Sequence, residues 1–103
     1  MTTKITIIYD NPTSSSAFES TFTDGQVALA KRVPTLESLE VSKVWPKEDG
    51  SATPKYRMLD LYFVDYAAAC RAVETREASA LFEAAAAASN GGLTVLFSDI
   101  EQS

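Results

Sequence analysis

The sequence contains no histidine among its 103 residues. Without an imidazole there can be no Ser-His or Cys-His nucleophile pair, and no histidine ligand for a metal or a haem. Acid–base chemistry would therefore fall to Asp, Glu, Tyr, Lys or Cys. The acidic residues form no compact cluster along the chain, and no glycine-rich phosphate loop is present. We therefore expect neither a metal nor another cofactor.

Cysteine and long apolar runs are also scarce. Cys70 is the only cysteine and cannot form an internal disulfide, which fits a reducing compartment such as the cytoplasm. The first apolar run, residues 5–8, is too short for the core of a signal peptide. No run approaches the length of a membrane-spanning helix, which needs about 20 apolar residues. We therefore expect a cytoplasmic protein with no membrane partner.

Positive charge is outnumbered, with 9 Lys and Arg against 14 Asp and Glu and a net charge of −5. This balance argues against nucleic acid and anionic membrane surfaces as partners. Hydrophobic residues make up 46% and charged residues 22% of the chain, which is typical of folded globular proteins. The length predicts one domain over residues 1–103, large enough to bury a core without disulfides.

Two kinds of apolar pattern alternate along the chain. β-Branched and aromatic residues dominate the segments that we expect to be strands, residues 4–10, 36–45, 55–65 and 93–100. Apolar residues at helical spacing predict one helix that ends at about Val33, with the serines at positions 14 to 16 as candidate N-caps. They also predict helical segments that Asp65 and Thr75 would cap. Cys70 falls on the apolar stripe of the helical segment after Asp65, where we expect a small core residue rather than a nucleophile.

Turn-forming and helix-breaking residues mark the ends and weak points of these elements. Asp24 and Gly25 interrupt the first helical pattern, which predicts a kink or a close backbone contact. Pro34 should end that helix, because the residue before a proline avoids the α conformation. Residues 46–54 predict a solvated loop, and residues 90–92 predict a helix cap and a turn.

The order β-α-β-β-α-β predicts a ferredoxin-like α+β fold, in which helices cover one face of a four-stranded antiparallel sheet. We expect the other face to carry Met58, Tyr62, one of Val44 and Trp45, and one of Ile8 and Leu96. That face would be too apolar to remain exposed, and its simplest cover is a second copy packed sheet to sheet about a two-fold axis. Two such sheets can enclose a cavity, so we expect a homodimer.

The central strand suggests where function lies. Side chains alternate along a strand, so Leu59, Leu61 and Phe63 should face the helices, and Tyr56, Met58, Asp60 and Tyr62 the open side. A carboxylate on a covered face would be desolvated, which raises its pKa and would suit Asp60 to act as a general base. The alternative is a buried Asp60 that is held by tyrosine hydroxyls, Lys43 or Arg57 and serves only assembly.

Segments along nearly the whole chain resemble the EthD family: KITIIYDNP, FESTFTDGQVALAKRVP, LESLEVSKV, LDLYFVDYAAACRA and GGLTVLFSDIE. The resemblance implies a small dimeric α+β-barrel protein. It also implies a role near that of family members, some of which are accessory to ether degradation. Relatives in the wider superfamily act on phenolic, lactone or polyketide-like molecules.

One polar position departs from the family pattern. The family carries a His followed by a Val-Pro-Leu-like segment near the end of its first helix, and the matching segment here runs from Gln26 to Leu29. Gln26 can orient a ligand by hydrogen bonds but cannot titrate. Without the family resemblance, Gln26 would be assigned to a helix surface.

Several side chains are candidates for binding a small apolar or aromatic ligand. The phenols of Tyr9, Tyr56 and Tyr62 could hydrogen-bond a phenol or a carbonyl while their rings line a cavity. Trp45 could stack on a ligand, and Met58 could contribute an apolar wall. The alternative is that the tyrosines pack an interface and that Trp45 anchors it.

Three hypotheses of function follow. The first is a binding or accessory protein of degradative or secondary metabolism that holds a small apolar, aromatic or ether molecule between two sheets. The second is a cofactor-free isomerase, cyclase or lyase, with Asp60 as base and Tyr62, Tyr56 or Tyr9 stabilising an oxyanion. The third is a structural dimer without a ligand.

Overall fold

The computed structural model describes residues 1–89 and 92–102. Its elements are β1 (Thr3–Asp10), α1 (Ser15–Thr21), the π-helical segment η1 (Phe22–Val27), α2 (Ala28–Ala30), β2 (Ser38–Lys43), β3 (Lys55–Phe63), α3 (Tyr66–Val73), α4 (Arg76–Ala88) and β4 (Leu93–Asp99). This order confirms the predicted β-α-β-β-α-β arrangement. Most of the turn predicted at residues 90–92 lies outside the described residues.

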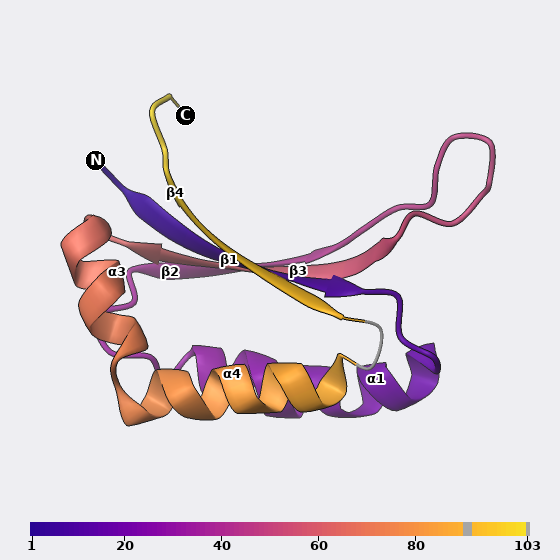
Figure 1. Cartoon of the computed structure of the whole chain (residues 1–103), viewed down its shortest axis with the longest axis horizontal. Helices are drawn as coiled ribbons and strands as arrows, with labels where there is room; N and C mark the ends of the chain where they lie inside the picture. Colours follow the sequence, from indigo (N-terminus) through magenta and orange to yellow (C-terminus); the bar gives the residue numbers. More distant parts are fainter. Residues whose placement is uncertain (90–91, 103) are drawn as a thin grey trace.

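The strands form one antiparallel sheet with the order β2-β3-β1-β4. The helices lie together on one face of this sheet, and no other described segment covers the opposite face (Figure 1). These features confirm the ferredoxin-like α+β fold. The longest described helix, α4, has 13 residues, which is fewer than a bilayer crossing requires.

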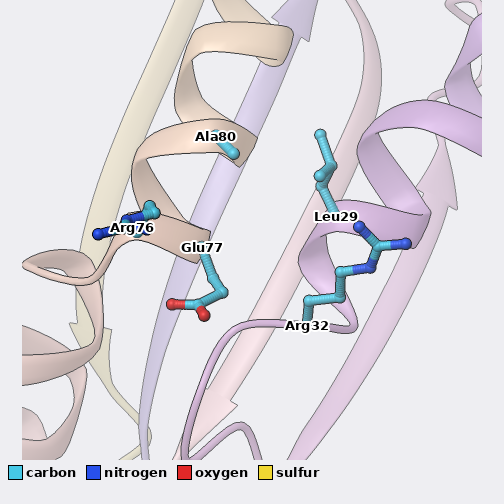
Figure 2. A pocket seen from close by; sticks show the side chains of 5 residues that line it. All are labelled: Leu29, Arg32, Arg76, Glu77 and Ala80. Carbon is cyan, nitrogen blue, oxygen red and sulfur yellow. The ribbon is translucent and has the colours of Figure 1, made fainter.

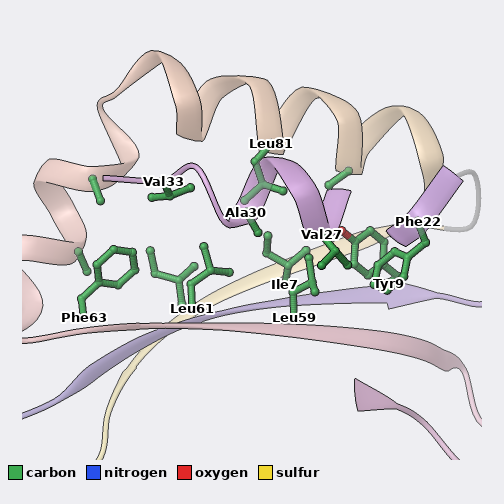
Figure 3. Packing of buried hydrophobic residues seen from close by; sticks show 14 of the residues in the cluster. Ile7, Tyr9, Phe22, Val27, Ala30, Val33, Leu59, Leu61, Phe63 and Leu81 are labelled. Carbon is green, nitrogen blue, oxygen red and sulfur yellow. The ribbon is translucent and has the colours of Figure 1, made fainter. Parts of the chain in front are cut away.

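The core fills the space between the sheet and the helices (Figure 3). As predicted, Leu59, Leu61 and Phe63 point into it, and each is at most 2% exposed. Burying an aliphatic or aromatic side chain of this size stabilises a fold by about 1.5–3 kcal/mol. The other buried residues of the cluster are Ile5, Ile7, Tyr9, Phe18, Phe22, Val27, Ala30, Val33, Ala68, Ala69, Ala72, Leu81 and Ala85.

Polar side chains begin the helices at the predicted positions. Ser14, Asp65 and Thr75 accept hydrogen bonds from backbone N–H groups three residues later, at the starts of α1, α3 and α4. These bonds satisfy N–H groups that have no partner within the helix. The caps therefore set where each helix starts.

The first helical region is not one continuous helix. The weak point predicted at Asp24 and Gly25 lies within η1, and the regular helix ends at Ala30 rather than at Val33. Backbone bonds from Arg32 and Val33 to carbonyls three residues earlier tighten the chain into turns there. The helix therefore ends at Ala30, before it reaches Pro34, the residue that was predicted to end it.

Three predicted strands are shorter in the structure, β4 by the single residue after Asp99 and β2 and β3 by more. β2 ends at Lys43, because Trp45 leaves the sheet and is followed by Pro46, which has no N–H to donate to a ladder. β3 ends at Phe63 because the chain turns at once into the cap of α3.

The predicted buried stripe of α3 is also shifted. Its buried residues are Ala68, Ala69 and Ala72, whereas Cys70 is only partly covered and Tyr66 is 58% exposed. Tyr66 packs edge-on against Phe97 of the edge strand β4, with ring centroids 6.1 Å apart. This contact lies at the rim of the helix layer, so the helix turns its alanines rather than Cys70 toward the core.

Candidate functional site

The sheet face that the helices leave bare, called here the open face, is organised as rows of side chains across the strands. Residues paired across antiparallel strands share a face. Asp60 pairs with Glu40 on one side and with Thr6 on the other, and Thr6 pairs with Leu96. The flanking rows consist of Ser42, Met58, Ile8 and Thr94, and of Ser38, Tyr62, Lys4 and Ser98. The structure therefore places both Ile8 and Leu96 on this face.

Asp60 lies in the middle row and is only 6% exposed. The Thr6 hydroxyl donates to its Oδ1 at 2.5 Å, and the Lys4 ammonium lies 3.8 Å from the same atom. Both contacts involve Oδ1, so among the described residues no side chain donates to Oδ2. A buried carboxylate is stable only when it is paired or hydrogen-bonded. Oδ2 is therefore able to accept a further hydrogen bond, since no described side chain donates to it.

The predicted partners of Asp60 were wrong. Lys43 and Arg57 pair with each other across β2 and β3. Arg57 lies three residues before Asp60 on β3, and side chains an odd number of residues apart point to opposite faces, so this pair lies on the helix side. Lys4 and Thr6 hold Asp60 instead, because β1 is its neighbour in the sheet. Nothing in the order of residues pointed to these two before the strand register was known.

Tyr62 shares the open face with Asp60, as predicted. Its hydroxyl donates to Oε1 of Glu40 on the neighbouring strand. That hydrogen bond, together with partial burial and the charges of Glu40 and Asp60, raises the pKa of Tyr62 to about 12. Tyr62 therefore keeps its proton at neutral pH. Its hydroxyl must leave Glu40 before it can stabilise an oxyanion.

Tyr56 does not lie beside Met58, contrary to the prediction. The pairing of β1 with β3 shifts between Tyr9 and Asp10, and Tyr56 is the unpaired residue at this bulge. An extra residue breaks the alternation of a strand. The ring of Tyr56 therefore packs edge-on against Phe18 of α1, with centroids 5.3 Å apart, on the helix side.

Tyr9 also lies in the helix-side core rather than on the open face. It is fully buried, and its ring meets the rings of Phe18 and Phe22 edge-on, with centroids 5.2 and 5.7 Å apart. Figure 3 shows Tyr9 beside Phe22 in this core. Its hydroxyl has no hydrogen-bond partner among the described residues, and burial raises the pKa of Tyr9 well above its ordinary value. The sheet separates Tyr9 from Asp60.

Gln26 is 3% exposed, so its assignment to a helix surface was wrong. It belongs to η1, whose wider turn shifts the phase of the side chains that follow. Its Oε1 has no partner within the described part of the chain, and an unmet buried acceptor costs about 1–3 kcal/mol. The spacing of Phe18, Phe22 and Gln26, four residues apart, was the signal for an inward face.

Trp45 stands apart from both groups. It is 84% exposed, and together with Lys43, Val44 and Pro46 it lines a hollow of about 390 Å³ beyond the end of β2. The predicted site residues therefore fall into three places. Met58, Asp60 and Tyr62 share the open face, Tyr9, Gln26 and Tyr56 lie on the helix side, and Trp45 lies at the sheet's end.

A further hollow, of about 170 Å³, lies between α2 and α4 and contains none of the predicted site residues. It is lined by Leu29, Arg32, Arg76, Glu77 and Ala80. Figure 2 shows the Arg76 side chain directed away from Arg32, with Glu77 between them. The two guanidinium groups do not converge, so the hollow offers no anion clamp.

Comparisons with known proteins support the fold at full length. The sequence matches no known family profile. It is 29% identical over 98 residues to an uncharacterized 11.0 kDa protein from the thcB-thcC intergenic region of Rhodococcus erythropolis. The aligned residues cover 95% of this chain and 94% of that protein.

Solved structures share the architecture over similar lengths. An ethyl tert-butyl ether d (EthD) family protein of Bacillus halodurans superposes with a TM-score of 0.90 at 22% identity, over 97% of this chain and 99% of that one. A dimeric ferredoxin-like protein of unknown function from Jannaschia sp. CCS1 has a TM-score of 0.69 at 13% identity, over 95% and 99%. SnoaB, a cofactor-independent oxygenase of Streptomyces nogalater, has a TM-score of 0.59 at 16% identity, over 99% and 94%. The chain thus has the ferredoxin-like α+β fold of an EthD family protein, as its sequence resemblance predicted.

Proposed function

We propose that residues 1–103 form one EthD-like domain that assembles as a homodimer and binds a small apolar, aromatic or ether-type molecule between its two sheets. The observation that carries the proposal is Asp60, an almost fully buried carboxylate on a bare sheet face with one oxygen unpaired. The role would be accessory to degradative or secondary metabolism, and a cytoplasmic location stays a prediction.

The apolar residues of the open face favour a second copy as its cover. Met58 and Ile8 are half-buried neighbours on the central strands, and Leu96 is 50% exposed on the edge strand. Covering such residues stabilises an assembly by roughly 25 cal/mol for each Å² removed from water. The Jannaschia protein with this fold is described as dimeric, which supports the same assembly here.

The middle row of the open face, which contains Asp60, indicates which chemical groups a ligand would need. A molecule whose apolar body lies over Met58 and Ile8 brings its polar end close to Asp60 in the next row. Oδ2 of Asp60 accepts a hydrogen bond, so a ligand with a hydroxyl or amine donor would be favoured over one without. A hydroxylated aromatic molecule or a hydroxylated ether meets both conditions.

Native mass spectrometry of the freshly purified protein tests this proposal. We expect a dimer that carries an additional small mass, which is released on denaturation. Met58→Trp would fill the cavity and yield a dimer without that mass, whereas Met58→Leu, which conserves volume, would retain it. A wild-type dimer that never carries or takes up a small apolar molecule would contradict the binding role.

Asp60 also favours a second function, that of a cofactor-free isomerase, cyclase or lyase in which its free oxygen removes a proton. The cofactor-independent oxygenase among the structural neighbours shows that this fold can support chemistry without a cofactor. Under this hypothesis Asp60→Asn should lower turnover of an isolated ligand at least about 100-fold, with the dimer unchanged in sedimentation. Unchanged turnover would exclude Asp60 as the base. A bound ligand that is never converted by the wild type would leave the binding role alone.

A further inference from the structure

The connection between β2 and β3, residues 44–54 and called here the arm, projects beyond the sheet. It rises on the side away from the helices, at the right of Figure 1. Hydrogen bonds inside the arm hold its tip: Lys47 N donates to Ser51 O, Gly50 N donates to Lys47 O, and Ser51 N donates to Oδ1 of Asp49, each at 2.9 Å. Gly50 has a backbone φ of +87°, which residues other than glycine rarely adopt. Hydrogen bonds of its own therefore give the tip of the arm a set shape.

The base of the arm is fixed to β1. Asn11 N donates to the carbonyl of Pro54 at 3.2 Å, and the Asn11 side-chain amide donates to the carbonyl of Thr53. The Thr53 hydroxyl donates to the carbonyl of Lys55 at 2.9 Å, where β3 begins. A segment that is ordered before it meets a partner loses less conformational entropy on docking than a flexible one.

Trp45, at the start of the arm, is the only tryptophan of the chain and is 84% exposed. It borders the hollow of about 390 Å³ that Val44 and Pro46 also line. Tryptophan is among the residues that most often dominate the binding energy of protein interfaces. An exposed indole beside an apolar hollow is therefore a candidate contact point for a partner protein.

From this geometry we infer that Trp45 packs against the second copy of this chain and anchors the arm on the partner's open face. The inference rests on the proposed homodimer. The arm rises on the same side of the sheet as the open face (Figure 1). It therefore points toward a second copy that covers that face. A two-fold axis makes the contact reciprocal, with each arm walling the cavity of the other protomer.

The intrinsic fluorescence of Trp45 tests the inference, because no other tryptophan contributes to the signal. We expect the dimer to emit at shorter wavelength than the monomer obtained by dilution, and to resist quenching by acrylamide. Sedimentation on the same samples reports the assembly independently. Dimers whose Trp45 is as quenchable as in the monomer would overturn this inference and leave the dimer standing. A protein that stays monomeric at every concentration would overturn both.

A substitution provides the second measurement. Trp45→Ala should raise the dimer dissociation constant about 10- to 100-fold, the range of interface anchors. The variant should fold normally because Trp45 lies outside the core. Lys47→Ala is the matched control, since it removes an exposed side chain from the tip of the same arm. Equal dissociation constants for wild type and Trp45→Ala would contradict the anchor.

Discussion

Replacing Tyr9 by alanine should lower the free energy of unfolding by about 3–5 kcal/mol, the usual cost of removing an aromatic ring from a core. The ring is fully buried and lies edge-on to the rings of Phe18 and Phe22, so the cavity would open where α1 and η1 rest on the sheet. Domains of this size are stable by only about 5–15 kcal/mol. Urea denaturation followed by circular dichroism measures the change.

Tyr9→Phe is the matched control and should have the opposite sign. It keeps the ring and removes a buried hydroxyl that has no partner among the described residues. Relief of that unmet group should raise the free energy of unfolding by about 1 kcal/mol. If the Phe variant is instead destabilised, the hydroxyl is hydrogen-bonded in solution, for example to a buried water molecule that also reaches Gln26. That result would indicate a bound polar molecule, such as water, in the core between the sheet and the helices.

Placing a carboxylate on the open face should have the largest effect on assembly. Met58 lies on the central strand β3, in the row next to Asp60. In a sheet-to-sheet dimer the new charge of Met58→Glu would be buried without a partner, close to a carboxylate that is already there. An uncompensated buried charge costs about 3–5 kcal/mol, so we expect the dimer dissociation constant to rise at least about 100-fold.

Two controls separate this effect from misfolding or from general repulsion. Met58→Leu should leave both the dimer and its stability nearly unchanged. Ser79→Glu adds the same charge to an exposed position of α4, far from the open face, and should leave the dimer intact. Analytical ultracentrifugation measures all three variants. A Met58→Glu dimer as tight as the wild type would show that the open face is not the interface.

Local patterns in the sequence determined the fold of this chain. The alternation of Leu59, Leu61 and Phe63 predicted a buried strand face, and the structure confirms it because nothing interrupts the pleat there. The caps at Ser14, Asp65 and Thr75 were also predictable. Capping depends on groups only two or three residues away, which a linear reading contains.

The candidate site was less predictable, because its contacts depend on strand pairing and helix phase. Tyr56 changed faces at a bulge that arises only where β1 pairs with β3. Gln26 turned inward because η1 has a wider turn than an α-helix. A shift of one residue in either element moves a side chain to another face. The sequence carries no local record of the bulge at Tyr56, whereas the four-residue spacing of Phe18, Phe22 and Gln26 was a signal for Gln26.

By itself, the sequence determined the order of elements, the helix-side core, the lack of any imidazole and the position of Asp60 on the face opposite Leu59. Only the tertiary structure decided that Thr6 and Lys4 hold Asp60, that Tyr9 lies on the other side of the sheet, and that Trp45 stays exposed. The physical reason is range. Alternation and capping act between residues close in the chain, whereas these environments are created by strands and helices brought together from distant parts of it.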